Sequence, residues 1–280
     1  MEAIVKRPAL RYHGGKWRLA EWIVGHFPAH DCYGEWYCGG ASPFLRKWRA
    51  RIEVLNDIDG DIVSFFRVLR DPVQAAELAQ LLALTPYARE EFQGAYELAA
   101  DPVEQARRLL VRSQMAFGSD ACNLARRTGF RTSRSTAANI GTPPSLDWSR
   151  YPGHVPEFTA RLQGALIENG DALELMPQFD GKGTLHYCDP TYWGREAAKM
   201  NRGYRHKYTM GDHVRLADRL RGLAGMVLIS GYRSDLYDEL YAGWHRVDRG
   251  VVVFRAKRAT ESLWLNARAV AALQAEGRPL

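Results

Sequence analysis

The second half of the chain alternates short apolar runs with segments of helical periodicity. The runs GALIENGD (164–171), GTLHYCDP (183–190) and GMVLISGY (225–232) have the length of buried strands, and each ends in polar or turn-forming residues. Between the last two, residues 210–223 repeat their apolar positions at helical spacing. Residues 245–256 and 260–267 are typical of antiparallel partner strands. The pattern predicts an α/β fold whose sheet ends in antiparallel strands.

The first 71 residues show the same mixture of elements. Residues 17–27 predict a helix that ends before Pro28, and residues 51–57 (RIEVLND) predict a strand. A second helix is expected after this strand, closed by Asp71-Pro72, with one apolar face formed by Ile58, Ile62, Phe65, Phe66 and Leu69. Residues 73–117 are expected to be helical throughout, whereas residues 118–156, rich in Gly, Ser, Thr, Pro and Arg, are expected to be irregular. We interpret this as a core domain over 1–71 and 157–280, interrupted by an inserted, mainly helical domain over 72–156.

Composition narrows the class of protein. The 280 residues are 46% hydrophobic and 25% charged, which describes a globular chain able to bury a large core. No apolar run approaches the roughly 20 residues of a membrane-spanning helix, and residues 1–16 lack the apolar stretch of a secretory signal, so we expect a cytoplasmic protein without membrane contact. The four cysteines form no CxxC pair and have no histidines at ligand spacing, and Pro28 separates His26 from His30. We expect neither a metal site nor disulfides.

The net charge of +6 is unevenly distributed. Ten residues, ARRTGFRTSR, contain four arginines and no acid, and a second basic segment, residues 195–208, contains one acid and interleaved tyrosines. A solvated basic face is one interpretation, but basic side chains among Gly, Ser, Thr and Tyr favour contacts with the phosphates of a nucleic acid. The candidate contact residues are Arg126, Arg127, Arg131 and Arg134 in the first segment, and Lys199, Arg202, Arg205 and Lys207 in the second.

Ligands of open α/β sheets bind at the carboxyl ends of the strands, so residues after predicted strands are candidates. RYHGGKWR (11–18) has two glycines and Lys16 before a helix. This suits binding of a carboxylate or phosphate by Lys16, or a plain turn at the start of a helix. YGEWYCGGASPFL (33–45) places Glu35 before the glycine pair that includes Gly39, which suits a cofactor or a plain loop. Asp57 follows a predicted strand and suits either a ribose diol or, like Asn56, a helix cap.

The segment LHYCDPTYWGR (185–195) ends an apolar strand with an acid, a proline and two aromatic rings. An exocyclic amine on a nucleobase is a poor nucleophile because its lone pair is delocalised into the ring. Acceptors for both N–H groups, here Asp189 and a neighbouring carbonyl, make that lone pair available. Tyr192 would supply a platform on which an extruded base stacks.

In this order, the segments resemble the DNA adenine methyltransferase family of the D12 class. The family pattern K-[WY]-x-G-G-K resembles RYHGGK, which puts Tyr12 and Lys16 at cofactor-binding positions. The pattern E-P-F-x-G-x-G resembles EWYCGGA, where Glu35 and Gly39 match while Trp36 and Ala41 depart.

Further matches extend the resemblance over about residues 9–266. It implies that Asp57 binds the ribose of the cofactor and that Asp171, in IENGDALEL, lies near the cofactor's adenine. The pattern D-P-P-Y resembles DPTY, which makes Asp189, Pro190 and Tyr192 the catalytic residues, with Asp189 also beside the cofactor and Thr191 in place of the second proline. LISGYRSDLYDELY resembles a later motif that completes the base pocket.

The resemblance implies a Rossmann-like methyltransferase sheet with an inserted target-recognition domain. The implied reaction transfers a methyl group from S-adenosylmethionine to N6 of adenine in double-stranded DNA, by base flipping and without a metal, in a bacterial or phage-encoded enzyme. Alternatives stay open: an acceptor in RNA or a protein glutamine amide, or a catalytically weak or silent DNA-binding protein on this scaffold. The recognition sequence, the oligomeric state and a pairing with a cognate restriction nuclease are also open.

Overall fold

The computed structural model describes residues 5–118, 122–124, 127–132, 142–194, 203–252 and 258–280. The chain forms two compact units, which are described separately here. The helical unit comprises Met1–Trp17, Gly39–Leu45 and Asp59–Gln163. The sheet unit comprises Arg18–Cys38, Arg46–Ile58 and Gly164–Leu280. The chain therefore passes from one unit to the other five times, after residues 17, 38, 45, 58 and 163.

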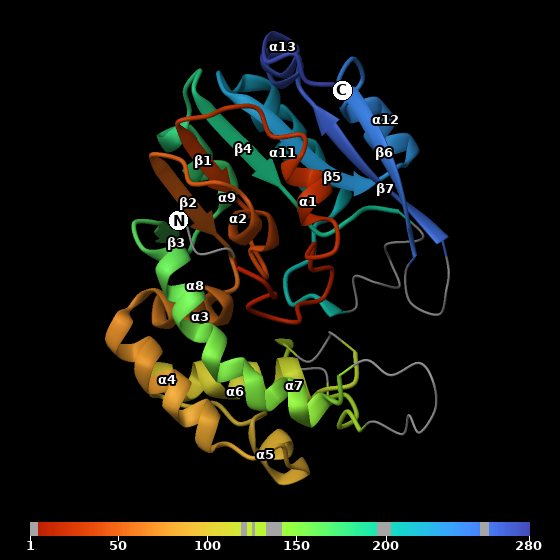
Figure 1. Cartoon of the computed structure of the whole chain (residues 1–280). Coiled ribbons are helices and arrows are strands. Elements are labelled where there is room, and N and C mark those ends of the chain that lie inside the picture. The colour runs from red at the N-terminus through yellow and green to blue at the C-terminus, as the bar shows by residue number, and fades with distance from the viewer. Residues whose placement is uncertain (1–4, 119–121, 125–126, 133–141, 195–202, 253–257) are drawn as a thin grey trace. The chain divides into compact units, whose positions relative to one another are not determined.

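A single mixed sheet organises the sheet unit (Figure 1). The strand order is β3-β2-β1-β4-β5-β7-β6. Strands β1 to β5 run parallel, and β7 pairs antiparallel with both β5 and β6, as the sequence predicts. The strands span Cys32–Glu35 (β1), Ile52–Asn56 (β2), Leu166–Glu168 (β3), Thr184–Cys188 (β4), Met226–Tyr232 (β5), His245–Val252 (β6) and Arg258–Leu265 (β7).

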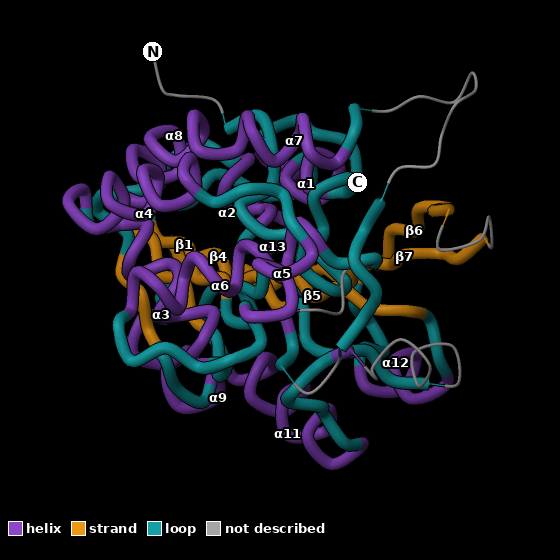
Figure 2. The backbone as a smooth tube through the Cα atoms, turned by 90° about the horizontal axis from the view of Figure 1, so that it is seen from below, coloured by secondary structure: helices purple, strands orange, loops and turns teal. Residues whose placement is uncertain are grey.

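Helices cover both faces of this sheet (Figure 2). Helix α11 (Met210–Gly222) buries Leu216 and Leu220 in a hydrophobic cluster with Val227 and Ile229 of β5 and with Trp36. The other face is covered by α1 (Ala20–Val24) and the chain that follows it, where the ring of Phe27 packs 5.5 Å from Tyr33 and 5.6 Å from Tyr187. Three further helices complete the unit: α9 (Ala172–Leu175), α12 (Asp235–Leu240) and α13 (Ala267–Ala275).

The helical unit contains α3 (Gly60–Arg70), α4 (Pro72–Leu84), α5 (Arg89–Gly94), α6 (Pro102–Met115), α7 (Pro144–Arg150), α8 (Val155–Leu162) and most of α2 (Ser42–Arg46) (Figure 1). The predicted apolar face of α3 is buried from Ile62 to Leu69. Asp71 and Asp101 each accept hydrogen bonds from the first backbone N–H groups of the helix that follows, and each stands before a proline at the first helical position.

Several sequence predictions are corrected by these elements. The helix expected over 17–27 is short, spanning Ala20–Val24. Ile58 precedes α3 and is exposed, because Asp59, rather than Asn56 or Asp57, caps this helix through the N–H of Asp61. Residues 73–117 are not one helical run, since the chain breaks around Pro86 and again before Pro102. Residues 144–156 were expected to be irregular, but they form α7, a 3-10 turn and the start of α8.

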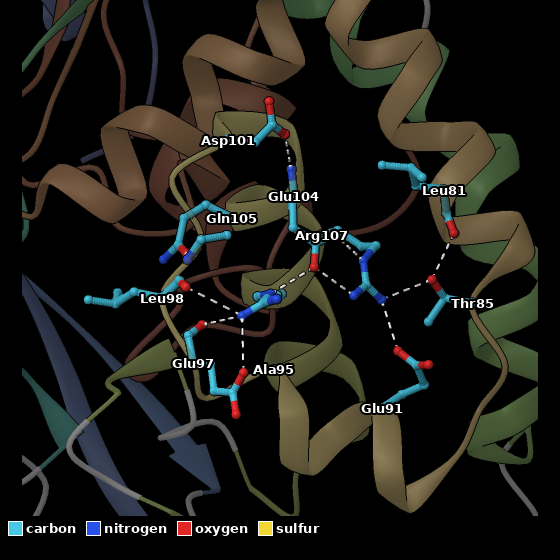
Figure 3. Close-up of polar contacts among 12 residues, drawn as sticks. Leu81, Thr85, Glu91, Ala95, Glu97, Leu98, Asp101, Glu104, Gln105 and Arg107 are labelled. Carbon is cyan, nitrogen blue, oxygen red and sulfur yellow. Dashed lines mark hydrogen bonds and ion pairs between the residues drawn. The ribbon is translucent and has the colours of Figure 1, made fainter.

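A polar network in the helical unit joins α6 to α5 and to the end of α4 (Figure 3). The carboxylate of Glu104 accepts hydrogen bonds from Arg107 (2.6 Å) and Arg108 (2.7 Å). Arg107 also donates to Glu91 of α5 (3.0 Å) and to the hydroxyl of Thr85 after α4 (3.1 Å). These contacts, first of all the hydrogen bond from Arg107, lower the pKa of Glu104 from its ordinary 4.5 to about 2.

This lowered pKa predicts an acid-sensitive contribution to stability. A carboxylate whose pKa is lower in the folded chain stabilises the fold above its ordinary pKa, and the contribution is lost as the pH falls through the folded value. We expect Glu104→Gln to lower the free energy of unfolding by about 1 kcal/mol at pH 7, and the difference from wild type to shrink between pH 4.5 and 2. Denaturant unfolding over this range measures it, with Glu77→Gln, at an exposed acid of α4, as control. A difference that is independent of pH would contradict the prediction.

Candidate active site

The carboxyl edge of the parallel strands gathers four of the predicted acids within the sheet unit. Glu35 is the last residue of β1, and Asp57 and Asp189 directly follow β2 and β4. The register aligns Glu35 with Leu55 of β2 and Tyr187 of β4, so these strands end at the same level. Asp171 follows β3 and caps α9 through the N–H of Leu173. The four acids thus stand at the ends of four adjacent strands.

The acids differ in their surroundings. Glu35 is buried, and its carboxylate accepts a 2.7 Å hydrogen bond from the hydroxyl of Tyr33. Asp57 is also buried, and the side chain of Asn169 donates to its backbone carbonyl at 2.8 Å. Asp189 is half-buried and Asp171 is exposed. Carboxylates are strong acceptors for hydroxyl and amino groups, so the edge suits a ligand with several such donors.

The side chain of Asn56 connects the residues that follow β1 and β3. From the sequence it was considered only as a helix cap. Its amide nitrogen donates to the carbonyls of Trp36 (3.0 Å) and Gly170 (3.2 Å), and its oxygen accepts from the N–H of Gly170 (3.1 Å). Its own carbonyl accepts from the N–H of Cys38. The strand end LND signalled a polar role for this residue. Its side-chain partners, however, lie 20 and 114 residues away in the sequence, so only the fold identifies them.

Trp36, which departs from the family pattern, is a core residue. Its indole N–H donates to Nδ1 of His186 at 3.0 Å, and the two rings stack. Nε2 of His186 then carries the proton and donates to Asp180 at 3.1 Å. Burial lowers the pKa of His186, which agrees with a neutral ring that accepts from Trp36. Gly34 leaves the space, because a Cβ there would lie 2.4 Å from Cζ2 of Trp36.

The aromatic ring of the DPTY turn is enclosed. Tyr192 is only 9% exposed, and its ring packs edge-on against Tyr232 at 4.8 Å. Its hydroxyl lies 2.9 Å from Oδ1 of Asp189 and is also hydrogen-bonded to Oε1 of Glu261. Burial raises the pKa of Tyr192 well above its ordinary value, so the hydroxyl keeps its proton. The sequence analysis expected a platform for a base; the ring instead stands against protein neighbours, and Glu261 was not among the predicted residues.

Thr191, the other departure in this turn, makes a contact that proline could not. Its hydroxyl accepts a 2.8 Å hydrogen bond from the backbone N–H of Tyr208. The hydroxyl of Tyr208 is in turn hydrogen-bonded to that of Tyr37, at 2.7 Å. This links the turn to residues 203–208, where Arg205 and Lys207 are exposed. Lys199 and Arg202 lie outside the described residues.

In the helical unit, Tyr12, Lys16 and Gly39 lie in one tight loop region. A Cβ on Gly39, which has φ +46°, would lie 2.6 Å from the ring of Tyr12. Lys16 is buried, and its ammonium group donates to the carbonyl of Gly14 at 2.9 Å. Ala41 takes φ +48°, a conformation that favours the glycine of the family pattern.

Part of the arginine-rich segment pairs with the residues at the end of α6. An isolated antiparallel bridge joins Ala116 and Phe130, the N–H of Arg131 donates to the carbonyl of Met115, and the hydroxyl of Tyr87 donates to the carbonyl of Arg131. The guanidinium of Arg127 lies 5.2 Å from the centre of the Tyr96 ring. Arg126 and Arg134 lie outside the described residues.

Arg11 belongs with this basic group, although the sequence analysis passed over it. Burial and then the charge of Arg131 lower the pKa of Arg11, so the two guanidinium groups are close enough to repel. Its place beside the RYHGGK glycines was visible in the sequence, but its nearness to Arg131 was not.

Among the residues that the structure describes, no three His, Cys, Asp or Glu side chains come together as a possible metal site. None of the helices formed by the described residues has the length and apolar character needed to cross a bilayer.

The sheet order, its antiparallel last strands and the acids at its carboxyl edge define the class as a Rossmann-like methyltransferase fold. A family model described as D12 class N6 adenine-specific DNA methyltransferase matches residues 12–123. The chain is 25% identical over 252 residues to the DNA adenine methylase of Escherichia coli (strain K12), and 24% identical over 250 residues to that of Salmonella typhimurium (strain LT2); both alignments cover 84% of each chain. The DNA adenine methylase of Haemophilus influenzae is 24% identical over 253 residues, which cover 85% of this chain and 83% of that protein. These similarities confirm the resemblance to the D12 class of adenine-specific DNA methyltransferases seen in the sequence.

The hydrogen bond of Thr191 generates a stability prediction. Thr191→Val keeps the shape of the side chain but leaves the N–H of Tyr208 without this acceptor, so we expect the free energy of unfolding to fall by about 1 kcal/mol. Thr191→Ser, which keeps the hydroxyl, should stay closer to wild type. Denaturant midpoints of the two variants and of Thr260→Val, at an exposed position of β7, measure the effect. Equal losses in Thr191→Val and Thr191→Ser would show that the hydroxyl does not stabilise the turn.

Proposed function

We propose that this enzyme transfers a methyl group from S-adenosylmethionine to N6 of adenine in double-stranded DNA, after the base has been flipped out of the helix. The observation that supports this most directly is the turn after β4, where Asp189 and Tyr192 stand beside the acids that follow β1, β2 and β3. A nucleoside cofactor and a nucleobase would then meet along one sheet edge, as ligands of such sheets do.

The residues present fit the cofactor. The carboxylate of Asp57 is suited to the ribose hydroxyls, Asp171 to the adenine, and Glu35, buried at the end of β1, to a positively charged or N–H donor group. In the helical unit, Tyr12, whose ring packs against Gly39, and Lys16 lie in one loop region, at positions that the resemblance assigns to the cofactor. When bound, S-adenosylmethionine supplies an electrophilic methyl group on its sulfonium.

The catalytic turn acts on the acceptor amine. Asp189 and the backbone carbonyl of Pro190 would accept the two N–H bonds of the amino group, which directs the nitrogen lone pair at the methyl. Holding nitrogen and methyl in line removes much of the entropic barrier. Tyr192 would stack on the flipped adenine once the contacts that enclose its ring separate.

Basic side chains support DNA as the substrate. Residues 72–156 lie within the helical unit, and we assign them the reading of the target sequence, while residues 1–71 and 157–280 carry the transfer. Arg127 and Arg131, with Arg126 and Arg134 of the same segment, would contact phosphates or base edges. Arg205 and Lys207, with Lys199 and Arg202, would hold the backbone beside the flipped adenine. The named relatives are bacterial, and we place the activity in the cytoplasm, where the DNA is.

The decisive assay supplies methyl-labelled cofactor and duplex DNA. We expect label in N6-methyladenine, and we expect Asp189→Ala to lower the rate at least about 100-fold while DNA affinity stays within a few-fold. Asp218→Ala, at an exposed acid of α11, is the matched control. DNA that is bound but unlabelled by wild type would favour a silent binder, and label in RNA or in protein glutamine would favour the other acceptors. Activity that persists in Asp189→Ala would remove Asp189 from catalysis.

The arginine-rich segment predicts a change in salt dependence. Each phosphate contact contributes nearly one unit to the slope of log affinity against log salt. Arg127→Ala combined with Arg131→Ala should weaken duplex binding and flatten that slope by about one to two units, whereas Arg70→Ala, at an exposed arginine that ends α3, should leave it unchanged. Binding measured over a salt series tests this, and an unchanged slope in the double variant would exclude the segment from phosphate contact.

A further inference from the structure

The hydroxyl of Tyr192 lies between two carboxylates. It is 2.9 Å from Oδ1 of Asp189 and is hydrogen-bonded to Oε1 of Glu261 as well. A tyrosine hydroxyl has one proton, so it donates to only one of these carboxylates at a time. The two acceptors therefore compete for the same donor, and another donor on Oδ1 of Asp189 favours the hydrogen bond from Tyr192 to Glu261.

Glu261 is held rigidly on the sheet. It lies in β7, where its partners across the two neighbouring strands are Tyr232 of β5 and Arg249 of β6. Because β7 runs antiparallel to β5, the early residues of β7 stand at the same edge as the end of β5. Glu261 is only 3% exposed, and the ring of its neighbour Tyr232 packs against the ring of Tyr192. The contact between Glu261 and Tyr192 thus comes from a paired strand rather than from a loop.

The competition of Asp189 and Glu261 for the hydroxyl of Tyr192 affects how Asp189 binds the adenine in the proposed reaction. An amino group of adenine that donates to Oδ1 of Asp189 competes with the hydroxyl of Tyr192 for that oxygen. A buried hydroxyl that gives up its acceptor without finding another is destabilising. A second acceptor at Glu261 removes that penalty, because Tyr192 can release Asp189 and remain hydrogen-bonded. It also limits how far the ring moves when the base binds, which matters because small displacements of groups around a reacting centre lower rates strongly.

We propose that Glu261 is a positioning residue for methyl transfer: it takes over the Tyr192 hydroxyl when the adenine amino group binds Asp189. This inference rests on the proposed function of Asp189 and goes beyond it by assigning a role to a buried acid on the antiparallel strand. Glu261 touches neither the base nor the methyl group in this role. In this role its effect passes through the hydroxyl of Tyr192, and that dependence makes it testable.

The experiment is a double-mutant cycle between Glu261 and Tyr192, measured as the single-turnover rate of DNA methylation at saturating S-adenosylmethionine and duplex. Glu261→Ala should lower the rate about ten- to a hundred-fold, with DNA affinity changed less than about twofold. Glu261→Gln, whose amide oxygen still accepts from the hydroxyl, should fall between wild type and Glu261→Ala. In a Tyr192→Phe background, which has no hydroxyl to hold, neither substitution should lower the rate more than about twofold further.

Ser262→Ala is the matched control, because Ser262 is the next residue of β7 and its buried hydroxyl donates to Asp248, away from the turn. It should leave the rate within about twofold of wild type. If Glu261→Ala does not fold, as thermal unfolding will show, the cycle is completed with Glu261→Gln.

Three results would overturn the inference: an unchanged rate in both Glu261 variants, the same fold-loss in the Tyr192→Phe background as in wild type, or an equal loss in Ser262→Ala. Failure of the proposed function is distinguishable, because the wild-type chain would then produce no N6-methyladenine at all.

Discussion

The side chain of Asn56 joins the exits of three neighbouring strands, and the geometry of the candidate site depends on it. Parallel strands end at a common edge, where their last peptide groups lose the partners that the ladder supplied. Asn56 provides partners for Trp36 after β1 and Gly170 after β3, while its own backbone binds Cys38. The residues next to Glu35 and Asp171 are therefore hydrogen-bonded to the same buried amide, which belongs to the residue before Asp57.

The departures from the family patterns have local explanations in the packing. Trp36 fits because Gly34 has no side chain and His186 accepts the indole N–H. Thr191 replaces a rigid proline with a hydrogen bond to Tyr208. Ala41 keeps the positive φ of the glycine position. Trp36 and Thr191 thus each make a new hydrogen bond, and the acids Glu35 and Asp189 still stand at the ends of β1 and β4.

The pattern of apolar positions predicted several elements of both units. It found the apolar face of α3, the helix α11, the buried strands β4 and β5, and the antiparallel pair β6–β7. It assigned no strand to β1, because four residues that include Gly34 form too short a pattern, although β1 lies between β2 and β4. It also joined α4, α5 and α6 into one run, where Asp101-Pro102 repeats the signal that correctly ended α3 at Asp71-Pro72.

By itself the sequence determined the order of the motifs, the α/β alternation and the acids that follow the strands, because these depend on residue type and local spacing. Only the tertiary structure decided which groups those residues meet. The packing of Tyr192 against Tyr232, its hydrogen bond to Glu261 and the bond from Tyr208 to Thr191 join residues 17 to 69 positions apart. Such contacts arise from the pairing of β5 with β7 and from the packing of loops on the sheet edge, and no local pattern encodes them. The buried hydroxyl of Tyr192 depends on such contacts, since a hydroxyl removed from water needs protein acceptors.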